Sequence, residues 1–420
     1  MQDGEIKIKK SKGRLAVLQE KLDSGEPLSG VMGIGHTRWA THGEPSDTNS
    51  HPHLSRSGRF AVVHNGIIEN YMKLRQMLIN KGFEFISETD TEVIAQLVEY
   101  YYNGDIVETL TKVVERVEGS YALGILCADN LDSFVAVRKE SPLIVGLGEG
   151  ENFIASDVPA ILAHTRDVYF LENDEIVLLD AENVKVYNLD GEEIKKESYH
   201  VEWDISAAEK GGYEHFMFKE IMEQPRVIRD TVQPRIRDGK IVLDDISLTA
   251  EYIKGINKIY IVACGSAYHV GVVGKYVIEA MTRVPVEVTV ASEFRYMNPI
   301  VDDKTLTVVI SQSGETADTI AAMREAKRLG SRTFAIVNAV GSAIAREADD
   351  VLYTWAGPEI SVATTKAYST QVTAIYLLSL YIAQELNMID DETLKTKLDA
   401  LEKSLKNEKY PEDLTSGYFD

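Results

Sequence analysis

The chain has 420 residues, of which 44% are hydrophobic and 26% are charged, and its formal net charge is -22. This length is enough for two or three globular domains, because single cores stop growing at roughly 250 residues. A surface this acidic repels nucleic acids and anionic membranes, so the composition argues against both as partners.

The first half of the sequence predicts antiparallel or mixed β structure with a few helices. Ser87-Glu-Thr-Asp90 predicts the start of a helix that runs to Tyr102, because its hydroxyls and carboxylate can accept hydrogen bonds from unpaired amide groups. The small, glycine-bearing segment 206–212 predicts a linker and a domain boundary. β-rich runs between turn residues predict strands at 60–64, 121–127, 133–137, 175–179 and 184–187.

After residue 258 the pattern changes to apolar strands that alternate with helices. This alternation is typical of a parallel sheet that is covered on both faces. The sequence beyond about residue 390 is charged and poorly patterned, so we expect a tail there. The predicted strands are 258–263, 286–290, 305–310, 333–337 and 350–355, and the main predicted helices are 268–281, 317–329 and 364–386.

The two cysteines, Cys127 and Cys264, lie far apart, and each belongs to an apolar run. Their spacing indicates reduced thiols rather than a disulfide or a zinc site, which favours a cytoplasmic protein. No apolar stretch reaches the length of a membrane span, and the first residues do not form a signal peptide.

Two motifs of the first half predict a site for an amino acid substrate. In His36-Thr-Arg-Trp-Ala-Thr-His-Gly43, Arg38 can bind a carboxylate with two hydrogen bonds and Trp39 can wall or gate a pocket. In His64-Asn-Gly-Ile-Ile-Glu-Asn70, the Asn65 amide and the Gly66 N–H can form an oxyanion hole for acyl transfer. Asp90 can pair with a substrate ammonium group.

Five histidines lie between His36 and His64 (His36, His42, His51, His53 and His64), so a metal site has to be considered. Their spacing matches no standard set of metal ligands, and no cysteine lies nearby. We therefore expect no metal there and assign these histidines to hydrogen bonds that order loops.

Three hydroxyl-rich loops of the second half predict a phosphate site. Ser311-Gln-Ser-Gly-Glu-Thr316 joins a strand to a helix, where amide groups and the helix dipole favour an anion, although a simple helix cap is the alternative. Cys264-Gly-Ser-Ala-Tyr268 and Val362-Ala-Thr-Thr-Lys-Ala367 have similar positions, at the edge where open parallel sheets bind ligands. Lys366 is either a phosphate partner or, more commonly for a single lysine, solvated.

Many motifs, in unbroken order, resemble glutamine–fructose-6-phosphate aminotransferase, which is also called glucosamine-6-phosphate synthase. They are HTRWATHG, HNGIIEN, SETDTE and ENFIASD, followed by HFMFKEIMEQP, ACGSAYH, ASEFRY, SQSGETADT and VATTKA. The resemblance implies α/β and α+β architecture: an incomplete αββα N-terminal-nucleophile glutaminase sandwich, then a doubly wound sugar-isomerase (SIS) lobe. The implied segments are a type 2 glutamine amidotransferase domain at 1–205, a linker at 206–225, the SIS domain at 226–395 and a truncated tail at 396–420.

The resemblance also implies an activity, which is conversion of fructose-6-phosphate to glucosamine-6-phosphate with ammonia from glutamine, without a cofactor or a metal. This reaction belongs to hexosamine and UDP-N-acetylglucosamine biosynthesis, and the family is typically dimeric through its SIS domains. Asn65 and Gly66 would form the oxyanion hole. Glutamine would be held by Arg38, Trp39, Thr41, His42 and Asp90, and the sugar phosphate by Ser266, Ser311, Gln312, Ser313, Thr316, Val362 and Thr364.

The chain departs from the family pattern at both ends. The family's nucleophile is an N-terminal cysteine, whereas this chain begins Met1-Gln2 and has no cysteine before Cys127. The second SIS lobe, with the isomerisation base and the imine-forming lysine, is also missing, so we expect a fragment that binds but does not catalyse. The alternatives are a non-catalytic sugar-phosphate-binding or regulatory protein, and a phosphoribosyl-transferring amidotransferase, against which SQSGETADT speaks.

Overall fold

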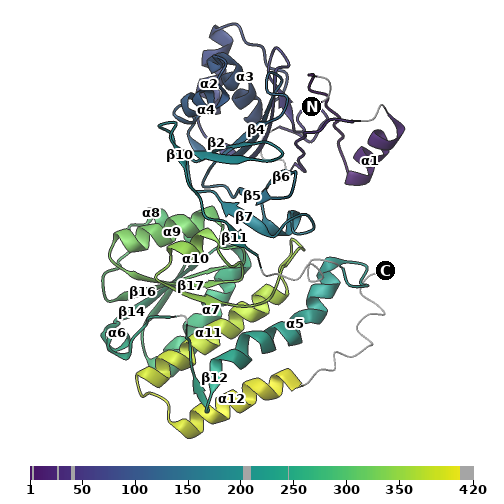
Figure 1. The fold of residues 1–420 in the computed structure, drawn as a ribbon. Coiled ribbons are helices and arrows are strands. Elements are labelled where there is room, and N and C mark those ends of the chain that lie inside the picture. Colours follow the sequence, from purple (N-terminus) through teal and green to yellow (C-terminus); the bar gives the residue numbers. More distant parts are fainter. Residues whose placement is uncertain (2–3, 26–27, 39–42, 202–209, 245, 407–420) are drawn as a thin grey trace. The chain divides into compact units, whose positions relative to one another are not determined.

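The computed structural model describes residues 1, 4–25, 28–38, 43–201, 210–244 and 246–406. The chain divides into two compact units, Met1–Glu202 and Trp203–Asp420. Figure 1 shows the helices and strands of both units, and each unit has its own hydrophobic core.

Unit 1 is built on two antiparallel sheets. The larger sheet has the strand order β1-β2-β3-β4-β8-β9-β10, and the smaller has the order β11-β7-β5-β6. The larger sheet consists of β1 (His53–Leu54), β2 (Phe60–Ile68), β3 (Gly119–Cys127), β4 (Phe134–Lys139), β8 (Ile176–Leu179), β9 (Val184–Tyr187) and β10 (Glu193–Ile194). The smaller consists of β5 (Ile144–Leu147), β6 (Asn152–Ala155), β7 (Asp167–Phe170) and β11 (Tyr199–His200).

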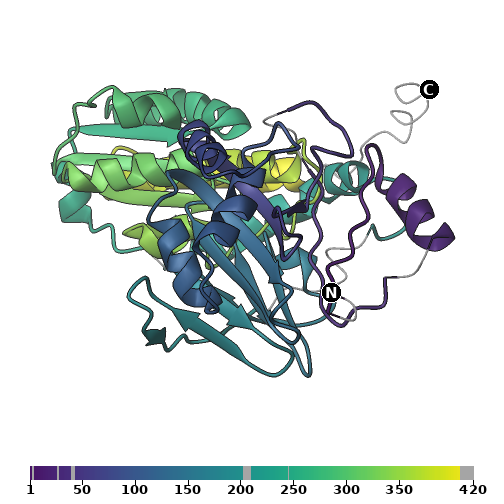
Figure 2. The ribbon, with the colours of Figure 1, turned by 90° about the horizontal axis from the view of Figure 1, so that it is seen from above.

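The larger sheet of unit 1 is buried on both faces. One face packs against α2 (Tyr71–Asn80), α3 (Thr91–Tyr101) and α4 (Ile106–Val114), in a core that includes Phe60 and Val62. The other face meets the smaller sheet in a second core around Ala136 and Val145. The short η1 (Val158–Ala160) follows β6. Helix α1 (Leu15–Ser24) has no buried residue and stands apart from both sheets in Figures 1 and 2.

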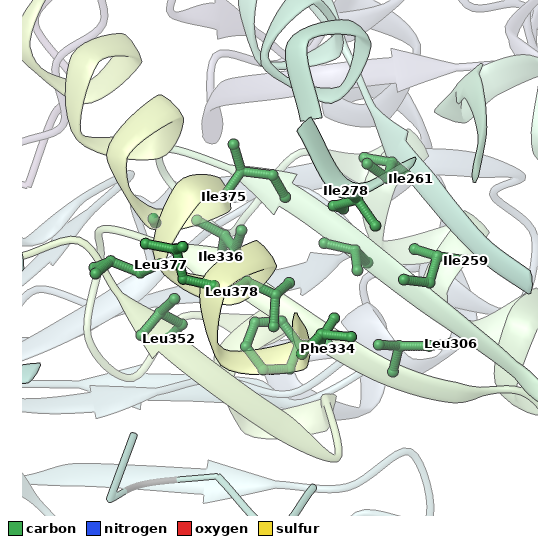
Figure 3. Packing of buried hydrophobic residues seen from close by; sticks show 14 of the residues in the cluster. Ile259, Ile261, Ile278, Leu306, Phe334, Ile336, Leu352, Ile375, Leu377 and Leu378 are labelled. Atoms are coloured by element: carbon green, nitrogen blue, oxygen red, sulfur yellow. The ribbon is translucent and has the colours of Figure 1, made fainter. Parts of the chain in front are cut away.

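Unit 2 contains a parallel five-stranded sheet with the order β15-β14-β16-β17-β18. The strands are β14 (Lys258–Ala263), β15 (Val286–Val290), β16 (Thr305–Ser311), β17 (Arg332–Val337) and β18 (Asp350–Tyr353). One face is covered by α7 (Gly265–Thr282) and α11 (Lys366–Glu385), the other by α8 (Ala291–Tyr296), α9 (Ala317–Arg328) and α10 (Ala343–Glu347). Figure 3 shows the first of these cores, in which Ile375 and Leu378 of α11 lie over Ile336 and Phe334.

Two segments of unit 2 differ from the expectation. Residues 216–225, which were expected to belong to a linker, form the first part of α5 (Phe216–Val232), because Lys219, Glu220 and Val227 are buried. The expected tail is helical as far as residue 406, in α12 (Asp391–Lys406). Its charged sequence contains Leu394 and Leu398, which lie one helical turn apart and pack into the core.

Short elements complete unit 2. They are η3 (Gln233–Arg235), β12 (Ile236–Arg237), β13 (Lys240–Ile241) and α6 (Ala250–Gly255). Within the described part of the chain, none of the helices combines the length and the apolar character that crossing a membrane requires.

Candidate functional site: an amino acid pocket and a hydroxyl-rich loop

Two of the predicted residues, Asn65 and Gly66, belong to strand β2 and line a pocket of unit 1. The residues of this strand from Phe60 to His64 are buried, whereas Asn65 to Ile67 become accessible. At this point lies a cavity of about 330 Å³. The predicted residues that line it are Arg38, Asn65, Gly66 and Asp90. Trp39, Thr41 and His42 lie outside the described residues, so their predicted role stays a prediction.

Asn65 and Gly66 are neighbouring residues of β2 that both line the cavity. Asn65 Oδ1 lies 2.7 Å from His36 Nε2, so this ring nitrogen donates to the carbonyl oxygen and leaves the Asn65 amide nitrogen to donate elsewhere. Gly66 has φ +120°, and a Cβ there would lie 2.1 Å from the Ser120 carbonyl oxygen. Glycine is therefore required at this position, and its backbone can approach a ligand closely.

Asp90 was expected to cap a helix, but it does not cap α3. Its Oδ2 accepts a hydrogen bond from the Ile68 N–H at 2.9 Å, so the carboxylate is tethered to the end of β2. Instead, Thr89 Oγ1 accepts from the Glu92 N–H at 3.4 Å, and the Glu92 carboxylate accepts from the Ser87 N–H at 2.6 Å. The hydrogen bonds at the start of α3 are therefore made by residues that flank Asp90, whereas Asp90 itself lines the pocket.

The Arg38 guanidinium is held beside the pocket by backbone carbonyl groups. Its Nη2 donates to the Gly43 oxygen at 3.0 Å, and its Nη1 donates to the Glu44 oxygen at 3.3 Å. The Arg38 guanidinium and the Asp90 carboxylate line the same cavity, and their charges suit the two charged groups of an α-amino acid.

The histidines of this region form a stack. The rings of His36 and His51 lie 4.2 Å apart at an interplanar angle of 19°, and His53 meets the edge of His51 at 5.1 Å. Among the described residues, no group of three His, Cys, Asp or Glu side chains is arranged to hold a metal ion. Loop-ordering contacts are present, since His51 Nδ1 accepts from the His64 N–H at 3.2 Å and His53 Nε2 lies 3.2 Å from Thr89 Oγ1.

Burial lowers the pKa of His36, His51 and His53, the last to about 3, with nearby positive charges as a smaller cause. A histidine with a depressed pKa stabilises the fold above its unfolded pKa of about 6.5, and this stability is lost as the pH falls. Between pH 7 and pH 5 we expect His53 to cost unit 1 about 2 kcal/mol, since its folded pKa lies below that window. The His53→Gln variant should lose less stability over this range, measured by hydrogen exchange of β2 and β3 amides. Equal pH slopes would contradict the expectation.

In unit 2 the loop 311–316 follows β16 and precedes α9. Ser311 is buried, and its Oγ accepts from the Gly314 N–H at 3.0 Å and lies 3.2 Å from Thr316 Oγ1. Ser313 Oγ accepts from the Glu315 N–H at 3.2 Å. Gly314 has φ +64°, and a Cβ on it would lie 2.0 Å from Ser342 Oγ. The hydroxyls thus gather in one tight turn at a helix start, a position that favours an anion.

The other predicted phosphate-site residues lie in two further loops. Ser266 is exposed in the first turn of α7. Val362 is also exposed, and the half-buried Thr364 donates its hydroxyl hydrogen to Glu359 Oε2 at 2.9 Å. Gln312, Ser313 and Thr316 are half-buried.

Both expectations for Lys366 are wrong. Its side chain is 1% exposed, and Nζ donates to Glu223 Oε2 at 2.7 Å. The residues next to Lys366 in the sequence could not reveal its true partner, because Glu223 belongs to the distant helix α5.

Asn338 is a structural residue of this edge that the sequence interpretation missed. Its N–H donates to the Gln312 oxygen at 3.2 Å, and its Nδ2 donates to the Gly357 oxygen at 2.7 Å. Its Oδ1 accepts from the Ala356 N–H at 2.8 Å. An asparagine directly after an apolar strand of a parallel sheet is the signal that could have identified it.

Comparison with known families finds two matches. Residues 36–163 match the glutamine amidotransferase domain, and residues 252–381 match the SIS domain. The first range encloses Arg38, Asn65, Gly66 and Asp90, and the second encloses all three hydroxyl-rich loops. The predicted fold class, a glutamine amidotransferase domain followed by an SIS domain with a parallel sheet, is thereby confirmed.

Two relatives are similar over nearly the whole chain. Glutamine–fructose-6-phosphate aminotransferase [isomerizing] of Caldanaerobacter subterraneus subsp. tengcongensis is 65% identical over 91% of this chain and 63% of its own length. The protein of that name from Clostridium tetani is 58% identical over 99% of this chain and 70% of its own length. The chain therefore spans about two thirds of the length of these relatives.

A solved structure is also similar. The C-terminal domain of glucosamine-fructose-6-phosphate aminotransferase from Francisella tularensis matches 47% of this chain and 56% of its own length, at 40% identity and a TM-score of 0.45.

Proposed function

The chain belongs to the glutamine–fructose-6-phosphate aminotransferase [isomerizing] family, and we propose that it provides the glutamine-binding and sugar-phosphate-binding parts of such an enzyme. The reaction is glutamine-dependent formation of glucosamine-6-phosphate from fructose-6-phosphate. The observation that supports this most strongly is the convergence of Arg38, Asn65, Gly66 and Asp90 on one cavity. We further propose that it acts in the cytoplasm and as a homodimer.

The chemistry of unit 1 suits the amide of glutamine. Asp90 and Arg38 offer charges opposite to those of the α-ammonium and α-carboxylate groups. The Asn65 amide and the Gly66 N–H offer two donors to the oxygen that becomes negative when the side-chain amide is attacked. These donors act by stabilising that charge, and they need no metal or cofactor.

We expect the 420-residue chain by itself to bind glutamine without hydrolysing it. Of its two cysteines, Cys127 is buried opposite Phe60, at the end of β2 that is remote from Gly66. Cys264 belongs to unit 2, at the N-cap of α7. The position of Cys127 therefore does not bring its thiolate to Asn65 and Gly66. The alternative, a non-catalytic sugar-phosphate-binding or regulatory protein, would also not hydrolyse glutamine, but no observation favours it.

Calorimetry with L-glutamine and with fructose-6-phosphate tests the proposal. Asp90→Asn keeps an acceptor for the Ile68 N–H but loses the charge, so glutamine should bind about 10- to 100-fold more weakly. The matched control is Asp132→Asn, which removes one charge from an exposed residue of the same unit. Unchanged glutamine affinity in Asp90→Asn, or release of ammonia by the purified chain, would contradict the proposal.

A further inference from the structure

The segment between β18 and α11 contains a carboxylate, that of Glu359, which binds the N-terminal end of α11. Glu359 Oε1 accepts from the Thr365 N–H at 2.9 Å and from the Ala367 N–H at 3.1 Å. Its Oε2 accepts from the Thr364 hydroxyl at 2.9 Å. The positive end of α11, a helix that runs from Lys366 to Glu385, is therefore occupied by an anion of the chain itself.

A second carboxylate fixes the other end of the same segment. Glu220 of α5 is 2% exposed, and its Oε1 accepts from the Ile360 N–H at 2.6 Å and from the Ser361 N–H at 3.1 Å. Residues 360–365 are thus clamped between Glu220 and Glu359, which fixes the backbone around the exposed Val362.

The clamped segment and the loop 311–316 both lie at the carboxyl ends of the strands of the parallel sheet. They follow β18 and β16, and Asn338 after β17 bonds to both sides through Gln312 and Gly357. Two helix starts, those of α9 and α11, therefore belong to the same edge. The start of α9 carries serine and threonine hydroxyls, and the carboxylate of its loop, Glu315, accepts from the Ala343 N–H of α10 at 2.7 Å. At the start of α11, in contrast, the Glu359 carboxylate accepts from amide groups of the helix start itself.

From this difference we propose that Glu359 determines specificity in the sugar-phosphate site, an inference that deepens the function proposed above. Its carboxylate directs phosphate to the 311–316 loop by occupying the amides of α11. Because a second phosphate near α11 would meet a like charge and find its donors taken, the site selects sugar monophosphates over bisphosphates. The 360–365 segment is left to contact the uncharged part of the sugar.

Amide NMR of the full chain, labelled with ¹⁵N-glycine and ¹⁵N-alanine and titrated with inorganic phosphate, tests where the anion binds. In the wild-type chain we expect shifts at Gly314 and Ala317 but not at Ala367. In Glu359→Ala, where the α11 amides are released, Ala367 should shift as well. A shift of Ala367 in the wild type, or none in Glu359→Ala, would overturn the role of Glu359. Silence of Gly314 and Ala317 in both chains would instead overturn the proposed phosphate loop.

Selectivity is tested by competition between fructose-6-phosphate and fructose-1,6-bisphosphate. Glu359→Gln removes the charge and keeps an acceptor oxygen, so the affinity for the bisphosphate relative to the monophosphate should rise about tenfold, which is about 1.4 kcal/mol. Glu359→Asp keeps the charge and should stay close to the wild type. The matched control is Glu392→Gln, an exposed residue of α12. An unchanged ratio in Glu359→Gln, with its unfolding midpoint preserved, counts against the proposal.

Discussion

Replacement of Glu223 by alanine is expected to destabilise unit 2 by about 3–5 kcal/mol, because it removes the carboxylate that pairs with the buried Lys366 ammonium. Lys366 Nζ lies 2.7 Å from Glu223 Oε2, and Lys219 Nζ lies 3.8 Å from Oε1. The side chains of these lysines are 1% and 8% exposed. A third cation, Arg226, contacts the same carboxylate at 3.1 Å from a more exposed position.

The comparison variant is Lys366→Met, which removes one buried cation and leaves Glu223 with Lys219 and Arg226. Methionine fills a similar volume without a charge, so we expect a loss of less than about 1.5 kcal/mol, in line with volume-conserving replacements. The free energy of unfolding of unit 2 in both variants is measured by urea unfolding, with hydrogen exchange of the β16 amides as the probe. If Glu223→Ala were no less stable than Lys366→Met, the destabilisation could not be assigned to unpaired buried charge.

The parts of the fold that sequence could predict are those with a continuous local signal. The strands 258–263 and 286–290 are confirmed with the bounds expected. In 258–263 an apolar run marks a strand that is buried on both faces, whereas 286–290 alternates valine with Glu287 and Thr289, as suits a half-buried strand at the edge of the sheet. The smaller sheet of unit 1 was not predicted strand by strand. Its strands β5, β6 and β7 have four residues each, and Gly146 interrupts the apolar pattern of β5.

Sequence reasoning about the sites failed where a partner comes from far along the chain. Lys366 is separated from Glu223 by 143 residues, so no window around VATTKA could reveal that its charge is paired. For Asp90 the local sequence was misleading instead. The start of a helix was predicted correctly, but the side chains that form its hydrogen bonds are Thr89 and Glu92, not Asp90. The 311–316 and 362–367 motifs could be placed from the sequence because the first follows an apolar strand and the second precedes an apolar helix. The motif at 36–43 has no described helix or strand next to it, and the roles of the motif residues stay predictions.

Replacement of Gly66 by alanine is expected to cost unit 1 roughly 3 kcal/mol or more and to abolish glutamine binding. Its φ of +120° disfavours any side chain, and the new Cβ would lie 2.1 Å from the Ser120 carbonyl oxygen and 2.9 Å from Ser141 Oγ. The contact with Ser120 is to backbone, so it can be relieved only by moving β2 away from β3. That movement would displace both Asn65 and the Gly66 N–H from the pocket.

Gly58→Ala is the matched control for this steric argument. Gly58 also has a positive φ, +74°, but no atom lies within 4 Å of the position that a Cβ would take, so alanine there introduces backbone strain alone, about 1 kcal/mol. Hydrogen exchange of the β2 and β3 amides gives the stability of unit 1 in each variant, and calorimetry gives glutamine affinity. Because Gly58 lies outside the pocket, Gly58→Ala should bind glutamine normally. Similar losses of stability in the two variants would show that strain, rather than the clash with Ser120, decides the need for glycine at position 66.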